Sequence, residues 1–280
     1  MANFVSMIVF PNAKINLGLA ITRRREDGYH DIETVMYPVG WTDILEIVPS
    51  PSGRTELFTS GHRMECPPEK NLVMKAYHAL DAIAPLPPVS IYLHKVIPDG
   101  AGLGGGSADA AFTLRALNTM FALGIDDRQL EATAATIGAD CPFFIRDTPV
   151  MATGTGTTFT PAEVSLAGYT IVIVKPAGSV STREAYAGVT SYSAPGRVAD
   201  ALSMPISQWQ GRLVNDFETA VAAQLPEVAA IKRRLIAMGA AYASMSGSGS
   251  AVFGLFDRDI LAEEAGREFP SSHTYVGRLD

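Results

Sequence analysis

The chain has 280 residues, 47% of them hydrophobic, which is enough for one large domain or two small ones. Its net charge of −7 and the lack of any run of five lysines and arginines disfavour nucleic acid or an anionic membrane as a partner. Its apolar runs are too short to cross a bilayer, residues 1–10 make a poor signal peptide, and Cys66 and Cys141 are its only cysteines. We therefore expect a soluble, cytoplasmic protein without a structural metal.

The first predicted elements are two strands, one in residues 1–10 and one in residues 14–21. In the second strand, apolar residues alternate with Lys14, Asn16 and two small residues, so the polar side chains share one face. Because small residues continue this face, we expect another part of the chain to pack closely against it. A solvated lysine on an edge strand is the alternative.

The middle of the chain predicts a strand at residues 89–93, then a glycine-rich loop and a helix that carries apolar residues at intervals of three and four. A second helix is expected at about residues 128–137. Residues 152–161, rich in glycine and threonine, predict a hairpin or the joint between two halves. We place the domain boundary there, which gives an N-terminal lobe of residues 1–158 and a C-terminal lobe of residues 159–280.

The C-terminal part predicts a buried strand at residues 169–175, stopped by Pro176, and a helix at residues 226–238 with Pro226 near its start. Strands and helices are mixed along the chain without a regular β-α-β rhythm. The fold class that this pattern favours is α+β with two lobes.

The glycine-rich loop is the most informative stretch of the chain. Its glycines allow positive φ angles and let a ligand approach the backbone, and the helix that follows turns unpaired N–H groups and its positive end toward one spot, which suits phosphate. The residues expected to bind the phosphates of a nucleotide are Pro98, Asp99, Gly100, Ala101, Gly102, Leu103, Gly104, Gly105, Gly106, Ser107 and Ala108.

Two other kinds of phosphate loop fit this stretch poorly. A Walker loop requires Lys-Ser or Lys-Thr after its last glycine, and no lysine stands there. A dinucleotide-binding loop would be followed by a second strand that ends in an acidic residue. Here Asp126 and Asp127 come directly after Gly124, which ends the helix, so no strand intervenes.

The loop resembles the second motif of the GHMP small-molecule kinases. Residues 11–17 (Pro-Asn-Ala-Lys-Ile-Asn-Leu) are similar to the first motif of that family and residues 246–250 (Ser-Gly-Ser-Gly-Ser) to the third, so the resemblance spans nearly the whole chain. Residues 27–30 (Asp-Gly-Tyr-His), 138–142 (Gly-Ala-Asp-Cys-Pro) and 180–186 (Val-Ser-Thr-Arg-Glu-Ala-Tyr) narrow it to the members that phosphorylate a cytidine-diphosphate-linked methylerythritol in the non-mevalonate isoprenoid pathway.

This resemblance implies a two-lobed fold with the active site in the cleft between the lobes, and transfer of phosphate from ATP, with Mg²⁺, to the 2-hydroxyl of the substrate. It makes Lys14 the catalytic lysine and Asp140 the general base. Asp140 is expected in a fixed turn, and the residues alone leave open whether it only stabilises that turn. A carboxylate that accepts the hydroxyl proton beside a lysine suits phosphoryl transfer. Its neighbour Cys141 has no histidine nearby and is expected to be a buried, inert thiol.

On the ATP side, the resemblance implies that Ser107 faces the β-phosphate or its Mg²⁺, although a helix N-cap is the alternative. Ala108 stands where many members of the family have a second serine. Lys95 and Asn71 resemble contacts with the adenosine, and exposed, solvated side chains are the alternative for both. The resemblance gives no residue of the chain as a metal ligand.

On the acceptor side, the resemblance implies that Tyr29 stacks on the cytosine, His30 hydrogen-bonds its polar edge and Tyr186 closes the other side of the ring. Asn16 and Thr182 would contact the same substrate. Two other functions compete with this one: a homoserine or mevalonate type of GHMP kinase, and an inactive relative that senses a ligand. The acceptor-side residues disfavour the first, and the retained catalytic pair disfavours the second. The oligomeric state is not predicted.

Overall fold

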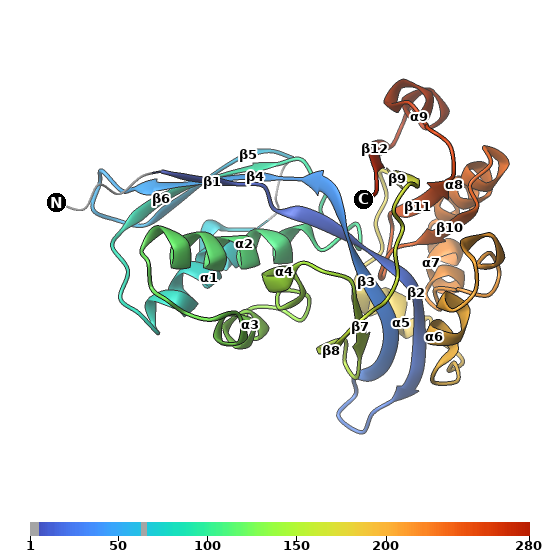
Figure 1. Ribbon diagram of the computed structural model, residues 1–280, viewed down its shortest axis with the longest axis horizontal. Helices are drawn as coiled ribbons and strands as arrows, with labels where there is room; N and C mark the ends of the chain where they lie inside the picture. The colour runs from blue at the N-terminus through green and yellow to red at the C-terminus, as the bar shows by residue number, and fades with distance from the viewer. Residues whose placement is uncertain (1–5, 63–65) are drawn as a thin grey trace. The chain divides into compact units, whose positions relative to one another are not determined.

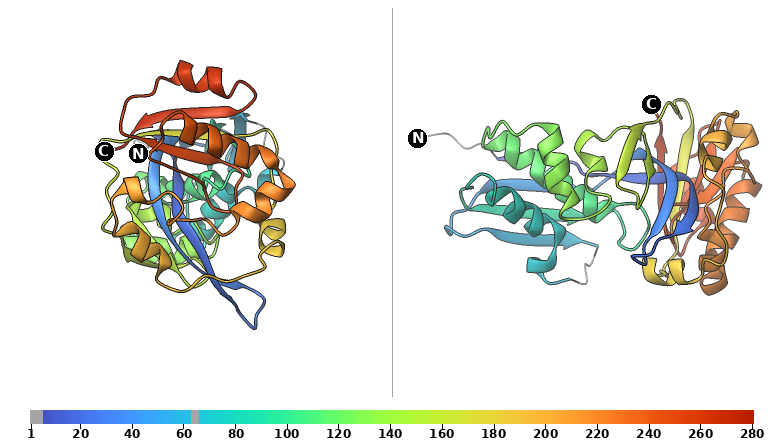
Figure 2. Two further views of the ribbon diagram at one scale, coloured as in Figure 1. Left: turned by 90° about the vertical axis from the view of Figure 1, so that its right-hand side faces the viewer. Right: turned by 90° about the horizontal axis from the view of Figure 1, so that it is seen from below.

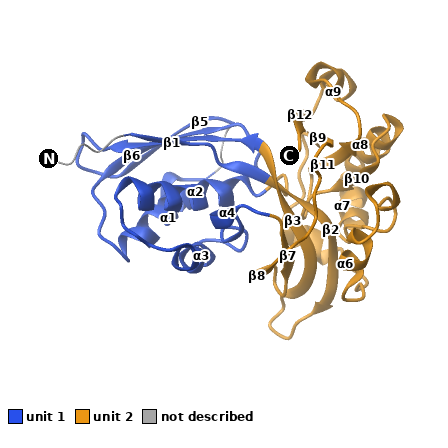
Figure 3. Ribbon diagram, in the orientation of Figure 1, with its two compact units in different colours: residues 1–13, 41–99, 104–148 blue, residues 14–40, 100–103, 149–280 orange. Residues whose placement is uncertain are grey.

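The computed structural model describes residues 6–62 and 66–280 (Figure 1). They form two compact units, each assembled from separate stretches of the chain (Figure 3). Unit 1 takes its residues from 1–13, 41–99 and 104–148, and unit 2 from 14–40, 100–103 and 149–280. The predicted division into lobes after residue 158 stays a prediction. The two units differ from it because each consists of three separate stretches of the chain.

Unit 1 is a four-stranded sheet with helices against one face (Figures 1 and 2). The strand order is β1-β4-β6-β5, with β5 parallel to β6 and the other pairs antiparallel. Its elements are β1 (Met7–Val9), β4 (Ile44–Pro49), β5 (Glu56–Gly61), the 3-10 turn η1 (Pro68–Lys70), α1 (Leu72–Asp81), β6 (Val89–Lys95), α2 (Gly105–Met120), α3 (Asp127–Ala135) and α4 (Phe143–Arg146).

The core of unit 1 follows from the alternation in its strands and from small residues in α2. Leu45 on β4 and Ile91 on β6 point to the helices and are fully buried. Ala110 and Ala111 let α2 lie close to the sheet, and Leu114 fills the space between the helix and the sheet. The predicted strand before the glycine loop and the helix after it are both confirmed.

Unit 2 contains two four-stranded sheets, of order β2-β3-β7-β8 and β10-β11-β9-β12. Helices α7 and α8 lie on the second sheet (Figure 1), and the tip of the β2–β3 hairpin extends beyond the rest of the unit (Figure 2). The elements are β2 (Asn12–Arg24), β3 (His30–Thr42), β7 (Val150–Thr153), β8 (Thr158–Pro161), β9 (Thr170–Lys175), α5 (Thr182–Ala187), α6 (Arg197–Leu202), η2 (Ile206–Gln208), α7 (Glu218–Gln224), α8 (Pro226–Ala237), β10 (Tyr242–Met245), β11 (Val252–Phe256), α9 (Ala262–Glu268) and β12 (His273–Arg278).

Several predicted elements of unit 2 are confirmed. The expected buried strand is β9, in which every residue is buried, and the expected helix is α8, with Pro226 as its first residue. The glycine- and threonine-rich stretch is the β7–β8 hairpin. In unit 1, β1 covers Met7–Val9, and residues 1–5 of the strand predicted within residues 1–10 lie outside the described residues. The helix expected to reach residue 137 is shorter than predicted, because it ends at Ala135 and continues as a turn. Within the described ranges, no helix is both long enough and apolar enough to span a membrane.

Candidate active site

The glycine loop leads into α2 through alternating left-handed residues. Gly100, Gly102 and Gly104 have φ angles of 61°, 73° and 73°, which side chains with a Cβ adopt only with strain. Gly104 is the N-cap of α2, and the first helical hydrogen bond runs from the Ala108 N–H to the Gly104 carbonyl. The N–H groups of Gly105, Gly106 and Ser107 have no carbonyl in a preceding helical turn, so they can donate to phosphate oxygens. Ser107 is the third helical residue, and the alternative that it is the N-cap is wrong.

The loop is divided between the two units, with residues 100–103 in unit 2 and residues 98–99 and 104–108 in unit 1. Gly102 packs so tightly in unit 2 that a Cβ on it would lie 2.1 Å from the backbone oxygen of Ser246. Its own carbonyl accepts hydrogen bonds from Lys14 Nζ at 3.1 Å and from Ser246 Oγ at 2.9 Å. Unit 2 therefore brings together residues 14–17 of the first motif, residues 100–103 of the second and the whole of the third.

Lys14 and Asn16 lie side by side on β2 and are only 3% and 1% exposed. Lys14 Nζ donates to Asn16 Oδ1 at 2.5 Å, and Asn16 Nδ2 donates to Thr34 Oγ1 at 3.1 Å on the neighbouring strand. Further along the same face, a Cβ on Gly18 would lie 2.6 Å from the Leu213 side chain. The close packing predicted for this face is confirmed, and the alternative of a solvated lysine is wrong.

Asp140 lies in the turn between α3 and α4, as predicted. The next residue, Cys141, is fully buried, and its thiol lies beside the hydroxyl of Ser107 in the first turn of α2. Burial raises the pKa of the Cys141 thiol to about 11, so it is neutral at physiological pH. Unit 1 therefore places the turn of Asp140 directly beside the start of the phosphate-binding helix.

Lys95 lies beneath this helix start and forms ion pairs with two carboxylates. Its Nζ contacts Asp109 Oδ2 at 2.7 Å and also Asp43, and its side chain is 1% exposed. Burial opposes the positive charge, but the two carboxylates outweigh it and hold the pKa of Lys95 above its usual value. Asp43 also accepts the N–H groups of Val96 and Ile97, at 2.6 and 2.8 Å. The cluster joins the end of β6 to α2.

Asn71 is the N-cap of α1, and its Oδ1 accepts the N–H of Val73 at 2.9 Å. It is buried, as Lys95 is, so the alternative of exposed, solvated side chains is wrong for both. Their contact with adenosine stays a prediction. In this structure the ammonium of Lys95 is held by carboxylates.

Two of the three rings predicted to surround a base lie together in unit 2. His30, the first residue of β3, stacks on Tyr186 of α5, with 4.8 Å between ring centroids and 18° between the planes. Tyr186 in turn packs edge-on against Phe217. Burial, together with the charge of Arg24, lowers the pKa of His30, which favours its neutral form. Tyr29, in the hairpin turn, is 67% exposed.

Thr182 is the first residue of α5, and its hydroxyl lies 2.9 Å from Ser248 Oγ in the third motif. A capping box made by Ser181 and Glu184 fixes the start of this helix. The third motif thus contacts both the strand of Lys14 and the helix that carries Tyr186.

Comparison with known proteins identifies the family. The model described as GHMP kinases N terminal domain matches residues 71–147, and that described as GHMP kinases C terminal matches residues 201–274. A 4-diphosphocytidyl-2-C-methyl-D-erythritol kinase of Parabacteroides distasonis is 53% identical over 92% of this chain and 94% of its own length. The chain belongs to the GHMP kinase family. The family resemblance and fold predicted from the sequence are confirmed.

Three further proteins are similar to the chain in sequence or in fold. A kinase of the same name from Bacteroides thetaiotaomicron is 52% identical over 90% of this chain and 92% of its own. The crystal structure of a 4-(cytidine 5'-diphospho)-2C-methyl-D-erythritol kinase, 32% identical, superimposes with a TM-score of 0.83 over 98% of this chain and 99% of that chain. A homoserine kinase from Cytophaga hutchinsonii, 19% identical with a TM-score of 0.74, covers 100% of this chain and 96% of its own and shares the fold.

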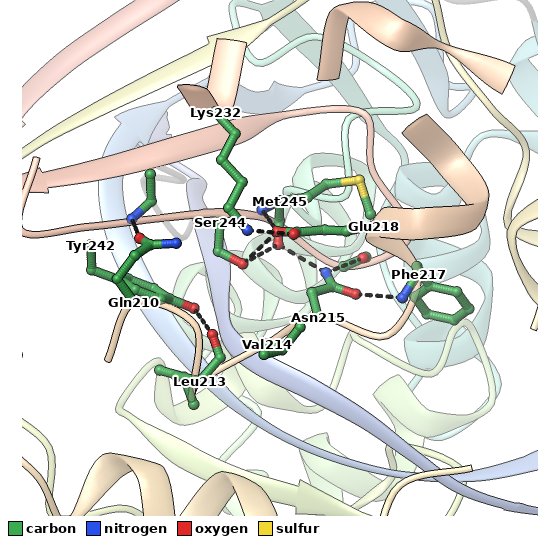
Figure 4. A network of polar contacts seen from close by, with 12 residues as sticks. Gln210, Leu213, Val214, Asn215, Phe217, Glu218, Lys232, Tyr242, Ser244 and Met245 are labelled. Carbon is green, nitrogen blue, oxygen red and sulfur yellow. Dashed lines mark hydrogen bonds and ion pairs between the residues drawn. The ribbon is translucent and has the colours of Figure 1, made fainter. Parts of the chain in front are cut away.

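One polar network of this GHMP kinase has no counterpart among the predicted site residues. Asn215 and Glu218 hold the strand and loop that lead into the third motif (Figure 4). The available signal was a polar pair, Asn215 and Asp216, between the apolar Val214 and Phe217. Polar side chains buried in such a stretch need hydrogen-bond partners, although the sequence does not say which.

Proposed function

We propose that this GHMP kinase transfers the γ-phosphate of ATP to the 2-hydroxyl of 4-diphosphocytidyl-2-C-methyl-D-erythritol, in the pathway to isoprenoid precursors. It is an ATP-dependent kinase that acts on a small molecule. The observation that carries the substrate is the identity of about 50%, over nine-tenths of the chain, to kinases named for this compound. The cytoplasm, and the absence of nucleic acid and membrane partners, remain part of the proposal because they rest on composition alone.

The first step of the proposal is that the start of α2 holds the phosphates of ATP. The N–H groups of Gly105, Gly106 and Ser107 would donate to phosphate oxygens, and the positive end of the helix dipole would add to their effect. Phosphoryl transfer is catalysed mainly by positioning and electrostatic stabilisation, and a rigid backbone cradle supplies both.

The adenosine would lie toward the start of α1. A cavity of about 400 Å³ lies there in unit 1, between β5, η1 and α1. Leu57, Phe58 and Met74 give it apolar walls suited to a flat base, and Asn71 caps the adjoining helix.

The chemical step needs a base and a cation, and we assign these roles to Asp140 and Lys14. Asp140 would accept the proton of the 2-hydroxyl as the oxygen attacks the γ-phosphate. Lys14 would stabilise the developing negative charge, and its Nζ is fixed by Asn16 and by the Gly102 carbonyl. The two residues belong to different units, so their action on one hydroxyl is part of the proposal.

Recognition of the cytosine would fall to the β2–β3 hairpin and α5. The stacked His30 and Tyr186 offer a ring surface and a neutral imidazole edge, and the exposed Tyr29 is able to cover the other side of the base. Asn16 and Thr182 would contact the rest of the substrate. A homoserine or mevalonate kinase has no flat base to recognise, so these residues favour the cytidine substrate.

The residues present fit Mg²⁺ bound mainly through ATP. No group of three or more histidine, cysteine, aspartate or glutamate side chains is placed to hold a metal within residues 6–62 and 66–280. Mg²⁺ prefers phosphate oxygens and water with few protein ligands, so a carboxylate cage is not required. Ser107, whose hydroxyl lies at the helix start, would be the protein group closest to it, and the ion would neutralise phosphate charge.

Replacement of Asp140 tests the mechanism. We expect Asp140→Asn to fold normally and to lose roughly 10²- to 10⁴-fold in turnover, because a general base contributes about this much. Asp126→Asn is the matched control, since asparagine keeps the cap that Asp126 forms on α3. Near-normal turnover of a folded Asp140→Asn would make Asp140 a turn residue.

The same assay decides the substrate. ADP release is measured with the cytidine compound, with homoserine, with mevalonate and without an acceptor. We expect release with the cytidine compound alone. Release with another acceptor would change the substrate, and binding of the ligands without release would indicate a sensor.

A further inference from the structure

Asn215 is the centre of the buried network around the third motif. Its side chain is 1% exposed, and its Nδ2 donates to the carbonyl of Met245 (Figure 4) and to that of Gly247, both at 2.8 Å. Its Oδ1 accepts the N–H of Phe217 at 3.0 Å. The amide therefore uses both of its N–H groups on two carbonyls that lie on either side of Ser246.

Glu218, at the start of α7, fixes the strand that enters the same loop. Its Oε1 accepts the N–H of Met245 at 2.8 Å and the hydroxyl of Ser244 at 2.9 Å, and its other oxygen forms an ion pair with Lys232 of α8 (Figure 4). The carboxylate of Glu218 thus fixes the strand that leads into the loop, while Asn215 binds the carbonyls on both sides of Ser246.

Ser246 connects this network to the site. Its Oγ donates to the Gly102 carbonyl at 2.9 Å and accepts the N–H of Asn16 at 3.2 Å. The next residue has little room for a side chain: a Cβ on Gly247 would lie 3.1 Å from the Gly102 oxygen and 3.2 Å from Asn16 Oδ1. Both of those oxygens accept hydrogen bonds from Lys14 Nζ.

The backbone around Asn215 is attached to the strand that carries Lys14. The N–H of Leu19 on β2 donates to the Val214 carbonyl at 3.0 Å, and the N–H of Asp216 donates to the Leu19 carbonyl at 2.8 Å. The main chain of Asn215 therefore follows β2 while its side chain holds the third motif. One residue fixes the distance between the two segments that position the ammonium of Lys14.

We propose that Asn215 is a positioning residue for phosphoryl transfer, which acts through Ser246 to hold Lys14, Asn16 and the Gly102 carbonyl in place. It rests on the proposed function, because Lys14 must act on the reacting phosphate for its position to matter. The amide is required for its donors. A carboxylate of the same shape has no N–H and would face two carbonyl oxygens.

The test is Asn215→Asp, with Asn118→Asp as its matched control. Asn118 lies in α2, and its Nδ2 and Oδ1 bond the carbonyl and the N–H of Ile125 at 2.8 and 3.1 Å, away from the assigned site residues. We expect Asn215→Asp to lower kcat by roughly 10- to 100-fold, with the KM values for ATP and acceptor changed less than about threefold. We expect Asn118→Asp to lower the melting temperature and leave kcat unchanged.

A double-mutant cycle with Ser246→Ala separates positioning from stability. If Asn215 acts through Ser246, the double variant loses hardly more kcat than the larger single loss. Additive losses would overturn the proposal, and so would an unchanged kcat in folded Asn215→Asp. Where Asn215→Asp does not fold, Asn215→Ser, which keeps an uncharged donor in a shorter side chain, takes its place in the cycle.

Amide hydrogen exchange keeps this proposal separate from the proposed function. We expect the backbone N–H of Asn16, which donates to Ser246 Oγ, to exchange faster in Asn215→Asp than in the wild type. Faster exchange with an inactive wild type would leave the local geometry standing and refute the function. Unchanged exchange at Asn16 with an active wild type would refute the role of Asn215.

Discussion

Gly102→Ala tests whether the packing of the phosphate loop against the third motif matters for catalysis. A Cβ at this position would lie 2.1 Å from the Ser246 oxygen and 3.0 Å from the Ser246 carbonyl carbon, so it would meet backbone rather than a flexible side chain. Relief of the contact moves the two segments apart by roughly 1 Å, and a misplacement of this size can cost about 10²-fold in rate. We expect kcat to fall by that order, because the Gly102 carbonyl that holds Lys14 Nζ moves as well.

Gly124→Ala is a close control for this variant. Gly124 has a φ of 69°, near the 73° of Gly102, but a Cβ there would meet nothing within 4 Å. Both variants bear a penalty of roughly 1–2 kcal/mol for a left-handed alanine, so the control removes that contribution. Overpacking should lower the free energy of unfolding of Gly102→Ala by about 1–3 kcal/mol more than that of Gly124→Ala.

The two variants are compared by urea unfolding and by ADP release in the presence of the cytidine substrate. Mg-ATP should raise the melting temperature of Gly124→Ala as it does for the wild type, and raise that of Gly102→Ala much less. The reasoning is refuted if Gly102→Ala turns over normally and loses no more stability than Gly124→Ala.

Two further predictions follow from the pKa shifts. Burial and Arg24 lower the pKa of His30, so kcat/KM for the cytidine substrate should persist as the pH falls below the usual histidine pKa of about 6.5 and decline only when the ring is protonated. In a pH profile of His30→Gln that acid decline should be missing. An unchanged profile would contradict the role of His30. Iodoacetamide should label the exposed Cys66 in the native protein but not Cys141, because burial raises the pKa of that thiol to about 11. Peptide mass spectrometry checks this, with urea-unfolded protein as the control, and native labelling of Cys141 would argue against its burial.

The sequence predicted those features that depend on neighbours along the chain. Alternation placed Lys14 and Asn16 on one face of a strand, and the small residues that follow them predicted close packing there. The glycine run predicted a helix start, although a serine cap at Ser107 was wrong because the left-handed Gly104 makes the turn itself. The position of Asp140 in a turn followed from Gly138 and Pro142.

Features that depend on distant pairing were not predictable from one sequence. The partners of Lys95 are 14 and 52 residues away, and the carbonyls that Asn215 Nδ2 binds are about 30 residues away. Alternation in β6 does put Lys95 on the buried face of its strand, but no local pattern gives the partners of such side chains, since these meet only when the chain folds. The stack of His30 on Tyr186 belongs to the same class.

The interleaved make-up of the two units limits how the protein can be rearranged. Unit 2 takes Lys14 and Asn16 of the first motif from residues 14–40, four residues of the phosphate loop from 100–103 and the rest from residue 149 onward. A chimaera of two family members joined at a single point within residues 41–148 would build unit 2 from both parents. To transplant unit 2 whole, with Asn215, Ser246, Lys14 and Gly102 from one source, three separate segments have to be exchanged together.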